Sequence, residues 1–433
     1  MADLWGRLKT AEPATSALQG AGQGVSAQVQ GAETPRQLGP TREQIPMTKP
    51  DEAQSQTGSP YFPFAVPSYR FDQRAEMFKR RTWDEEILPH AKRLYTQVHY
   101  QEKYGYRKLD YALRNAAWSM EYGYGFGNMR SNTGLYSWTH VADKVERFIE
   151  EGGRVEHSPE ENARIVKKAA RFLGADLVGI CYAHPNLIYS HELDLVSMEH
   201  RPMELPQGCT NAVIMAVEMD YEAACYSPDA IAGASTGLGY SMQAVLANLV
   251  ATFIRGLGYR AIPCGNDTAL SIPLAMAAGL GELGRMGLLV TRRFGPRVRI
   301  CKVFTDLPLT HDGYRPFGVT EFCRTCKKCA QSCPSRAISF GEPTTEGPST
   351  SNHSGVSKWY INPEACFLFW TKNWMDCNNC VRACPFNKPA GVLHDCVRYF
   401  IEKAPALNRF MLWMDDLFGY GRVVPKKDFW ESS

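Results

Sequence analysis

Eight cysteines near the C-terminal end of this 433-residue chain constrain its fold more than any other feature. The first four are Cys323, Cys326, Cys329 and Cys333, with Pro334 directly after the last. This is the C-x2-C-x2-C-x3-C-P spacing by which ferredoxin-type domains bind iron–sulfur clusters through thiolates. The second set repeats the pattern with its first cysteine further upstream, and its members are Cys366, Cys377, Cys380 and Cys384. Two such sets predict two 4Fe-4S clusters and therefore electron transfer.

The spacing also predicts which cysteines share a cluster. In two-cluster ferredoxins the fourth cysteine of each run binds the other cluster. We therefore assign one cluster to Cys323, Cys326, Cys329 and Cys384. We assign the second cluster to Cys333, Cys366, Cys377 and Cys380. A zinc ribbon is the alternative, but a zinc site closes with four ligands and does not call for a third cysteine followed by x3-C-P.

Size and composition limit what the rest of the chain does. The two cysteine sets lie within residues 322–387, so most of the chain forms a larger body that uses the electrons. An apolar content of 44% suits a globular protein with a sizeable core, and a net charge of +3 indicates no preference for nucleic acid. The other six cysteines show no pairing pattern, so we expect them reduced and mostly buried. They are Cys181, Cys209, Cys225, Cys264, Cys301 and Cys396.

Composition changes predict five segments along the chain. They are a low-complexity arm over 1–58, an aromatic-rich region over 59–150, a core over 151–310, a ferredoxin-like segment over 311–395 and a C-terminal segment over 396–433. The alternation of aromatic residues and glycine over 121–127 either lines a pocket or forms a turn whose rings fill the core. We favour the second interpretation.

The sequence of the core segment predicts alternating helices and strands. Ser158 begins a capping box, and Ile165, Ala169 and Phe172 give the following helix an apolar stripe. A long helix is expected after Ser235 and Thr236, up to Gly256. Its predicted apolar face consists of Met242, Val245, Leu246, Leu249, Phe253 and Ile254. Strands are expected over 176–181, 211–219, 260–263, 288–291 and 297–304, and a further helix over 271–278. This pattern indicates a layered α/β or α+β core.

No stretch has the uninterrupted apolar length of a membrane span, because the nearest, over 242–259, contains Asn248 and Arg255. The N-terminal residues show neither an apolar signal core nor a twin-arginine motif. We therefore expect either a cytoplasmic protein or a mature form from which a signal has been removed.

Five sequence blocks precede the cysteine sets in a specific order. They read LGADLVGI over 173–180, TGLGYS over 236–241, PCGNDT over 263–268, GLGELGR over 279–285 and FGPRVRI over 294–300. With the cysteine sets, these blocks resemble the catalytic subunit of the respiratory, corrinoid-dependent reductive dehalogenases over about 150–395. The resemblance implies an α+β protein, with a nitroreductase-like α/β core that binds a base-off corrinoid and a two-cluster ferredoxin-like domain. It also implies Co(I)-dependent removal of halide from an organohalide, such as a small chlorinated hydrocarbon.

Such a reaction leaves a carbon that needs a proton in a dry pocket. The resemblance implies that Tyr240 donates it, that Arg299 favours the phenolate, and that Asn266 is a polar partner. It also places Thr236 near the corrinoid and Trp374 in the substrate pocket. From residue type alone other interpretations stay open. Tyr240, expected to open a helix, suits core packing, Asn266 suits a helix N-cap, and Arg299 suits a solvated strand face.

Two other functions compete with reductive dehalogenation. An epoxyqueuosine reductase shares the cofactors, but it would favour a basic groove and a carboxylic acid as proton donor. A non-catalytic electron carrier is disfavoured by the size of the core. Family members of this kind imply a small membrane anchor subunit as partner, a homodimer, and a peripheral location at the outer face of the cytoplasmic membrane. A cytoplasmic location is the alternative.

Overall fold

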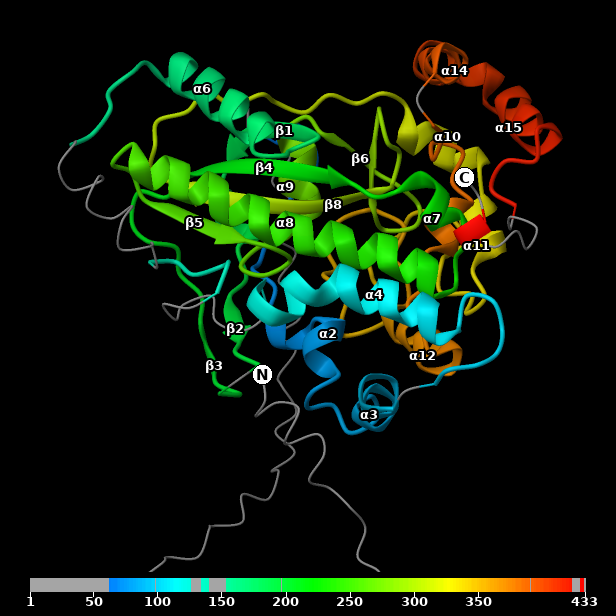
Figure 1. The fold of residues 1–433 in the computed structure, drawn as a ribbon. Helices are drawn as coiled ribbons and strands as arrows, with labels where there is room; N and C mark the ends of the chain where they lie inside the picture. The colour runs from blue at the N-terminus through cyan, green and yellow to red at the C-terminus, as the bar shows by residue number, and fades with distance from the viewer. Residues whose placement is uncertain are drawn as a thin grey trace, which may run out of the picture.

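The centre of the molecule is a four-stranded antiparallel sheet (Figure 1). Its order is β1 (Leu177–Tyr182), β4 (Asn211–Glu218), β8 (Val298–Thr305) and β5 (Ala261–Cys264). The computed structural model describes residues 62–97, 99–125, 134–139, 153–195, 197–389, 391–422 and 429–431. The predicted arm over 1–58 lies outside these residues. All five strands predicted in the core are present, with bounds that agree or are shifted by one residue.

Both faces of the sheet are buried beneath helices. On β4, Val213 and Met215 pack with α8 (Ala230–Gly256) and α6 (Pro159–Phe172), whereas Ala212 and Ile214 pack with α9 (Ser271–Ala277) on the other face. Successive side chains of a strand point to opposite faces. The apolar run over β4 therefore fills two cores, and the fold is α+β.

Helix α8 begins earlier than predicted. The Asp229 carboxylate accepts hydrogen bonds from the backbone N–H groups of Ile231 (3.0 Å) and Ala232 (3.3 Å), which is an N-cap. Two of the six residues of the predicted apolar face are misplaced, because Met242 and Leu249 are 43% and 40% exposed. The buried side consists largely of glycine, alanine and serine. A pattern of large apolar side chains does not reveal a buried face made of small residues. Such residues nevertheless allow neighbouring helices and strands to approach closely.

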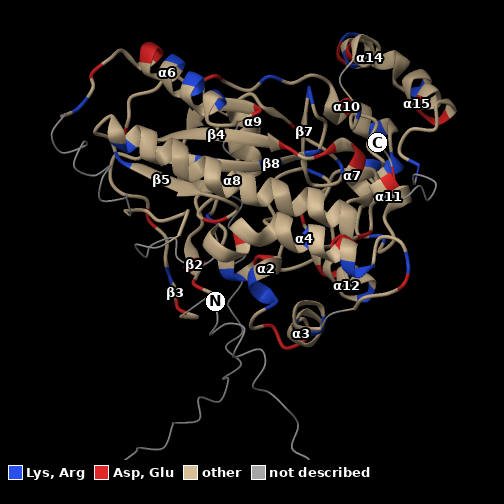
Figure 2. Ribbon diagram, viewed as in Figure 1, with Lys and Arg blue, Asp and Glu red and all other residues tan. Residues whose placement is uncertain are grey.

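By length and composition alone, α8 is apolar enough to cross a membrane. In this structure the sheet packs on it, and so does α4 (Lys108–Met120) (Figure 1). Figure 2 shows that α8 is almost entirely free of charged residues. Its single charged residue, Arg255, is buried and donates to the backbone carbonyl of Ala261. The apolar character of α8 is accounted for by its place in the core.

Helix α6 has the predicted cap but a different buried stripe. The Ser158 hydroxyl accepts from the backbone N–H of Glu161 at 3.2 Å. The residues that face the sheet are Ala163, Val166 and Ala170, and Phe172 is 88% exposed. The small alanines let α6 lie close to the sheet, which turns Phe172 away from it.

Smaller elements surround the core. Two short hairpins pair β2 (His191–Leu193) with β3 (His200–Pro202) and β6 (Gly281–Leu283) with β7 (Leu289–Thr291). The described N-terminal region contributes α2 (Met77–Arg80), α3 (Leu88–Thr96) and α4. The end of α4 continues as a π-helical turn over Glu121–Gly125, where the sequence predicted a glycine-rich turn. Tyr124 in this turn is 60% exposed, so only part of the aromatic run fills the core.

The cysteine-bearing segment is mainly helical. It contains α10 (Val319–Thr325), α11 (Lys328–Ser332), α12 (Pro363–Asn373) and α13 (Asn379–Arg382). The chain then forms α14 (Val392–Lys403) and α15 (Asn408–Leu417), which stand at the edge of the molecule (Figure 1). Short α7 (Tyr221–Cys225) lies between β4 and α8 and contacts α13.

Candidate active site

The eight cysteines gather in space as two groups that cross the order of the sequence. Burial raises the pKa of the Cys384 thiol well above its ordinary value, and the neighbouring Cys323, Cys326 and Cys329 raise it further. Interactions between charged groups fall off with distance. Cys384, which belongs to the second set in the sequence, therefore lies beside the first three cysteines of the first set.

The other group contains the remaining four cysteines. Burial raises the pKa of Cys366 to about 12, followed by the influence of Cys377 and Cys333. Cys380 interacts most strongly with Cys377 and Cys366, and after them with Cys329 and Cys333, while Cys333 also acts on Cys377. Cys333 of the first set therefore lies with the second.

This donor set fits iron–sulfur clusters. Thiolates so well buried would repel one another unless a metal balanced their charge, and cluster iron does this. The other six cysteines are free, as predicted. Four of them are buried, Cys225 is half-buried and Cys396 is exposed.

Tyr240, Asn266 and Arg299 come together from three elements. The Asn266 Nδ2 atom donates to the Tyr240 hydroxyl at 2.9 Å, and the Arg299 guanidinium carbon lies 5.0 Å from the centre of the Tyr240 ring. Tyr240 lies in the middle of α8, not at a helix start. Asn266 is not an N-cap, because α9 begins at Ser271. Arg299 reaches the site from β8, so it is not a solvated strand residue.

The ring of Tyr240 is also held by a stack of aromatic residues from α4 and the π-helical turn that follows it. Trp118 stacks on Tyr240 with ring centres 5.1 Å apart and planes 19° apart, and Tyr122 stacks on Trp118 at 4.9 Å. The Trp118 indole donates to the backbone carbonyl of Gly233 at 3.1 Å. Sequence reasoning missed Trp118. The only signal for it was the pair of glycines beside Tyr240.

Those glycines make room for the groups around the tyrosine. A Cβ atom on Gly237 would lie 2.2 Å from Cδ1 of Trp118, and one on Gly239 would lie 2.8 Å from Cγ of Arg299. Both distances are far below van der Waals contact. The two glycines of the TGLGYS block therefore allow Trp118 and Arg299 to approach α8 closely.

The surroundings of Tyr240 act on its acidity in opposite directions. Burial raises the pKa of Tyr240 above its ordinary value of 10.0, whereas the charge of Arg299 and the hydrogen bond from Asn266 lower it. Arg299 therefore favours the phenolate, but burial is the larger effect. The phenol consequently keeps its proton at neutral pH and is available as an acid.

Thr236 joins the tyrosine site to the cysteines. Its hydroxyl accepts from Nδ2 of Asn378 at 2.6 Å and from the Arg299 guanidinium at 3.4 Å. Asn378 directly follows Cys377. The two parts of the candidate site are therefore connected by side chains that touch.

Trp374 contacts residues other than those around Tyr240. It follows α12 with a left-handed φ of 61° and stacks on His99, with ring centres 4.4 Å apart. The guanidinium carbon of Arg93 lies 4.4 Å from its ring centre. None of the described contacts of Trp374 is with Tyr240.

Several buried polar atoms around α8 lack a hydrogen-bond partner among the described residues. They include Nε of Arg299, Nε of Arg114 and both carboxylate oxygens of Asp376. Asp376 and Arg114 form only a long ion pair, at 3.5 Å. Buried polar groups are normally satisfied, so such a concentration is typical of a ligand site. Donors and acceptors so arranged fit a large cofactor that carries many amide groups, such as a corrinoid.

Comparison with known proteins agrees with this geometry. Residues 322–388 match the family described as "4Fe-4S dicluster domain". This match coincides with the predicted cysteine segment. The fold and the site thus define an oxidoreductase that carries two 4Fe-4S clusters.

Two comparisons identify the family. The tetrachloroethene reductive dehalogenase of Desulfitobacterium hafniense is 36% identical in an alignment that covers 79% of this chain and 75% of that protein. The solved structure of the catabolic reductive dehalogenase NpRdhA has a TM-score of 0.65 and 26% identity. That alignment covers 82% of this chain but only 47% of NpRdhA. This chain belongs to the reductive dehalogenase family, as the sequence blocks predicted.

The alternative of an epoxyqueuosine reductase has weaker support. An epoxyqueuosine reductase of Leadbetterella byssophila is 31% identical, but only over 114 residues, or 26% of this chain. The reductive dehalogenases match about three times as much of the sequence. The chain is therefore an oxidoreductase of the reductive dehalogenase class, not a simple electron carrier.

Proposed function

We propose that this protein removes halide reductively from an organohalide, using a bound corrinoid, two 4Fe-4S clusters and a proton from Tyr240. The observation that carries the proposal is the phenol of Tyr240, held by Asn266 and Arg299 and linked through Thr236 to Asn378, the residue after Cys377. Another solved reductive dehalogenase, 25% identical with a TM-score of 0.63, is described as suggesting "a mechanism for B12-dependent dehalogenation". The proposed core is nitroreductase-like, which the helix-covered antiparallel sheet supports.

The cofactors have residues that fit them. One cluster takes Cys323, Cys326, Cys329 and Cys384 as ligands. The other takes Cys333, Cys366, Cys377 and Cys380. The residues around α8 that would hold the corrinoid are Thr236, Arg299, Asp376 and Asn378. When bound, the corrinoid supplies the electrons that cleave the carbon–halogen bond.

The side chains provide the proton and stabilise the anion that remains. The Tyr240 hydroxyl donates its proton to the carbon that has lost the halide. The phenolate that remains is stabilised by the hydrogen bond from Asn266 and by the charge of Arg299. Trp118 keeps the ring in place by stacking.

The proposed substrate class is small chlorinated hydrocarbons. The support is the 36% identity to a tetrachloroethene reductive dehalogenase. The test is chloride release from tetrachloroethene by the cofactor-loaded enzyme, with reduced viologen as electron donor. Chloride release supports the proposal. Activity on an epoxyqueuosine-containing tRNA stem loop without chloride release from any organohalide would overturn it.

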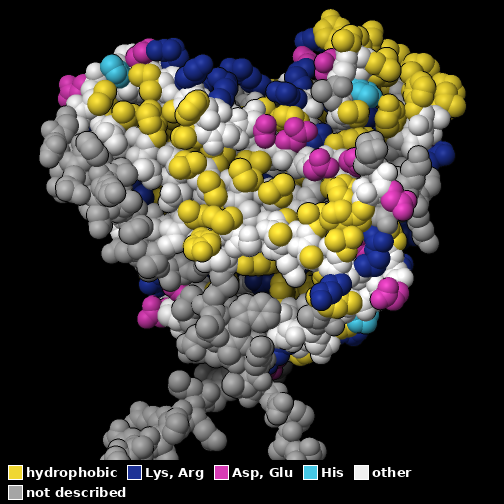
Figure 3. Space-filling view, in the orientation of Figure 1, with side chains coloured by type: hydrophobic (Ala, Val, Ile, Leu, Met, Phe, Trp, Pro, Cys, Tyr) yellow, Lys and Arg dark blue, Asp and Glu magenta, His cyan; other side chains and the backbone are white. Residues whose placement is uncertain are grey.

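We further propose that the protein functions as a homodimer bound to a small membrane anchor subunit at the outer face of the cytoplasmic membrane. The support for the anchor is the apolar outer surface of α14 and α15, visible at the upper right of Figure 3. Phe410, Trp413 and Leu417 are 50%, 57% and 64% exposed there. Clustered exposed apolar residues are typical of an interaction surface.

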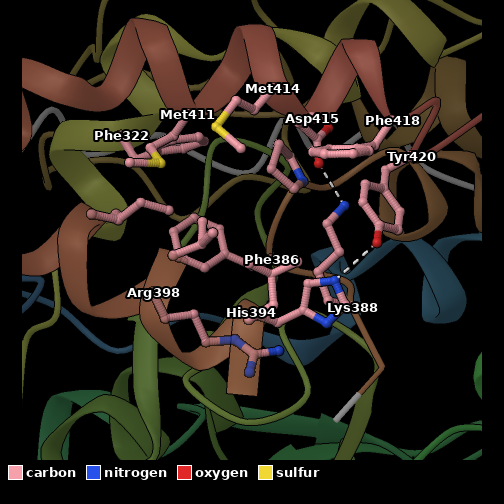
Figure 4. Close-up of a pocket in the computed structure, with 14 residues that line it drawn as sticks. Phe322, Phe386, Lys388, His394, Arg398, Met411, Met414, Asp415, Phe418 and Tyr420 are labelled. Atoms are coloured by element: carbon pink, nitrogen blue, oxygen red, sulfur yellow. Dashed lines mark hydrogen bonds and ion pairs between the residues drawn. The ribbon is translucent and has the colours of Figure 1, made fainter. Parts of the chain in front are cut away.

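The inner sides of these helices are already occupied. Met411 packs against the cluster that contains Phe322 and Phe386 of the cysteine segment, and Met414 lines the pocket between them (Figure 4). The outer side therefore remains for a partner. Purification from detergent extracts without a small hydrophobic protein would contradict the anchor proposal.

A further inference from the structure

Two histidines and an aspartate meet at the base of the β2–β3 hairpin, on elements that the proposed reaction does not use. Asp72, His191 and His200 each offer a ligand atom, and these atoms all lie within 4.8 Å of one another. His200 Nε2 lies 2.9 Å from the Asp72 carboxylate. The His191 and His200 rings have centres 4.8 Å apart and are tilted by 31°.

Backbone hydrogen bonds fix the segments that carry these residues. The N–H of Ser190 donates to the carbonyl of Phe71 at 2.9 Å, which joins the residues before His191 and Asp72. In the hairpin, His191 is paired with Pro202 and Leu193 with His200, so both histidines point to one face. The three side chains are therefore brought together by the backbone, not only by attraction between their own charges.

The surrounding polar groups suit metal ligation. Nδ1 of His191 lies 3.2 Å from the Ser190 hydroxyl, so donation to that hydroxyl leaves Nε2 with a free lone pair. The Asp72 carboxylate accepts from the backbone N–H of Arg74 at 2.8 Å. Metal-binding histidines and carboxylates are commonly oriented in this way by a second hydrogen bond. Asp72 and His200 keep about a third of their side-chain surface exposed, which gives an ion access.

We propose that Asp72, His191 and His200 bind a divalent transition-metal ion such as Zn²⁺, with water completing the coordination. Two imidazoles and one carboxylate are a ligand set that zinc accepts in a tetrahedral site with one open position. Bonds of about 2 Å in a tetrahedral site place the ligand atoms about 3.3 Å apart, so the longest separation needs to close by up to about 1.5 Å, which side-chain rotation provides.

This ion would have a structural role. Asp72 leads into α2, and α2 carries Phe78, whose ring centre lies 5.7 Å from that of Trp370 in α12. A metal that joins Asp72 to the hairpin would thus hold the N-terminal segment against the body of the enzyme. The inference does not depend on the proposed dehalogenation.

The test uses the cofactor-loaded full chain in a Cys396→Ser background, because Cys396 is the one exposed thiol among the described residues. The enzyme is first treated with a chelator under conditions that leave the visible absorbance of the clusters unchanged. Zn²⁺ is then titrated by calorimetry. The variants are His200→Asn and Asp72→Asn, and the latter retains an oxygen that accepts from Arg74. His157→Asn is the matched control, since His157 is an exposed histidine away from this cluster.

We expect one zinc ion per chain in the parent and in His157→Asn, and a higher thermal midpoint when zinc is present. Each ligand variant should bind zinc at least about tenfold more weakly and lose the thermal shift. The variants should match the parent in midpoint when zinc is absent, which separates metal binding from a folding defect. Equal zinc binding in the parent and both ligand variants, or no binding in the parent, would overturn the proposal.

Discussion

Replacing Tyr240 with phenylalanine tests the proton donor directly. The phenyl ring keeps the stacking on Trp118, and the change removes only the hydroxyl that accepts from Asn266. Asn266 is exposed, so its amide can bond to water, and the stability cost should be below about 1 kcal/mol. Loss of a general acid should lower the rate by about 10² to 10⁴. That factor corresponds to about 3 to 5 kcal/mol in the activation barrier.

The assay is halide release with reduced viologen, measured on parent and variant with matched cobalt and iron contents. A thermal melt confirms that the fold is intact. Full activity in Tyr240→Phe with intact cofactors would remove this tyrosine from the mechanism and leave water or another residue as the donor.

The acidity of Tyr240 gives the same prediction a pH signature. Because burial holds the pKa above 10.0, the phenol should remain protonated throughout neutral and mildly alkaline pH, and it should impose no alkaline loss of rate there. Arg299→Leu removes a charge that lowers the pKa, so the pKa should rise further and the phenolate should be less stable. Turnover should slow at every pH. A loss of rate with rising pH that begins below pH 9 in the parent and is absent in Tyr240→Phe would contradict this account.

Three further predictions follow from particular side chains. Gly237→Ala gains about 1 kcal/mol of helix propensity, but it places a methyl 2.2 Å from Trp118, so we expect a net loss of stability and activity. Gly256→Ala, with open space around it, is the matched control, and equal melting of the two variants would refute the steric argument. Cys384→Ala should abolish the cluster signal of Cys323, Cys326 and Cys329 in electron paramagnetic resonance of the reduced enzyme, whereas loss of only the other signal would reverse the assignment. Burial and then Asp267 raise the pKa of Glu121 from 4.5 to about 8, so the folded state binds a proton that the unfolded state releases. The free energy of unfolding should therefore fall as pH rises from 4.5 to 8. In chemical denaturation over that range, the stability of Glu121→Gln relative to the parent should increase with pH. The same pH dependence in both proteins would disprove the prediction.

The sequence by itself determined the iron–sulfur segment. The spacing of cluster ligands is a local property of the sequence. Cys323 to Cys333 and the later set can therefore be identified as ligands without knowledge of the residues that pack around them. The strands and the cap at Ser158 are also local, because hydrophobic alternation and a side-chain oxygen before a helix act over a few residues. The grouping of Cys384 with the first set followed from a general rule about such domains.

Tertiary structure decided how the helices face the core and what surrounds Tyr240. Periodicity shows that a helix has an apolar face, but the packing partner selects which side is buried, and so Phe172 and Met242 became exposed. Trp118 lies 122 residues before Tyr240, and the two meet only because glycines let α4 approach α8. The net direction of the Tyr240 pKa depended on burial, which no residue spacing reports. Close approach and desolvation arise from segments far apart in the chain, and this is the physical reason that the sequence alone did not determine them.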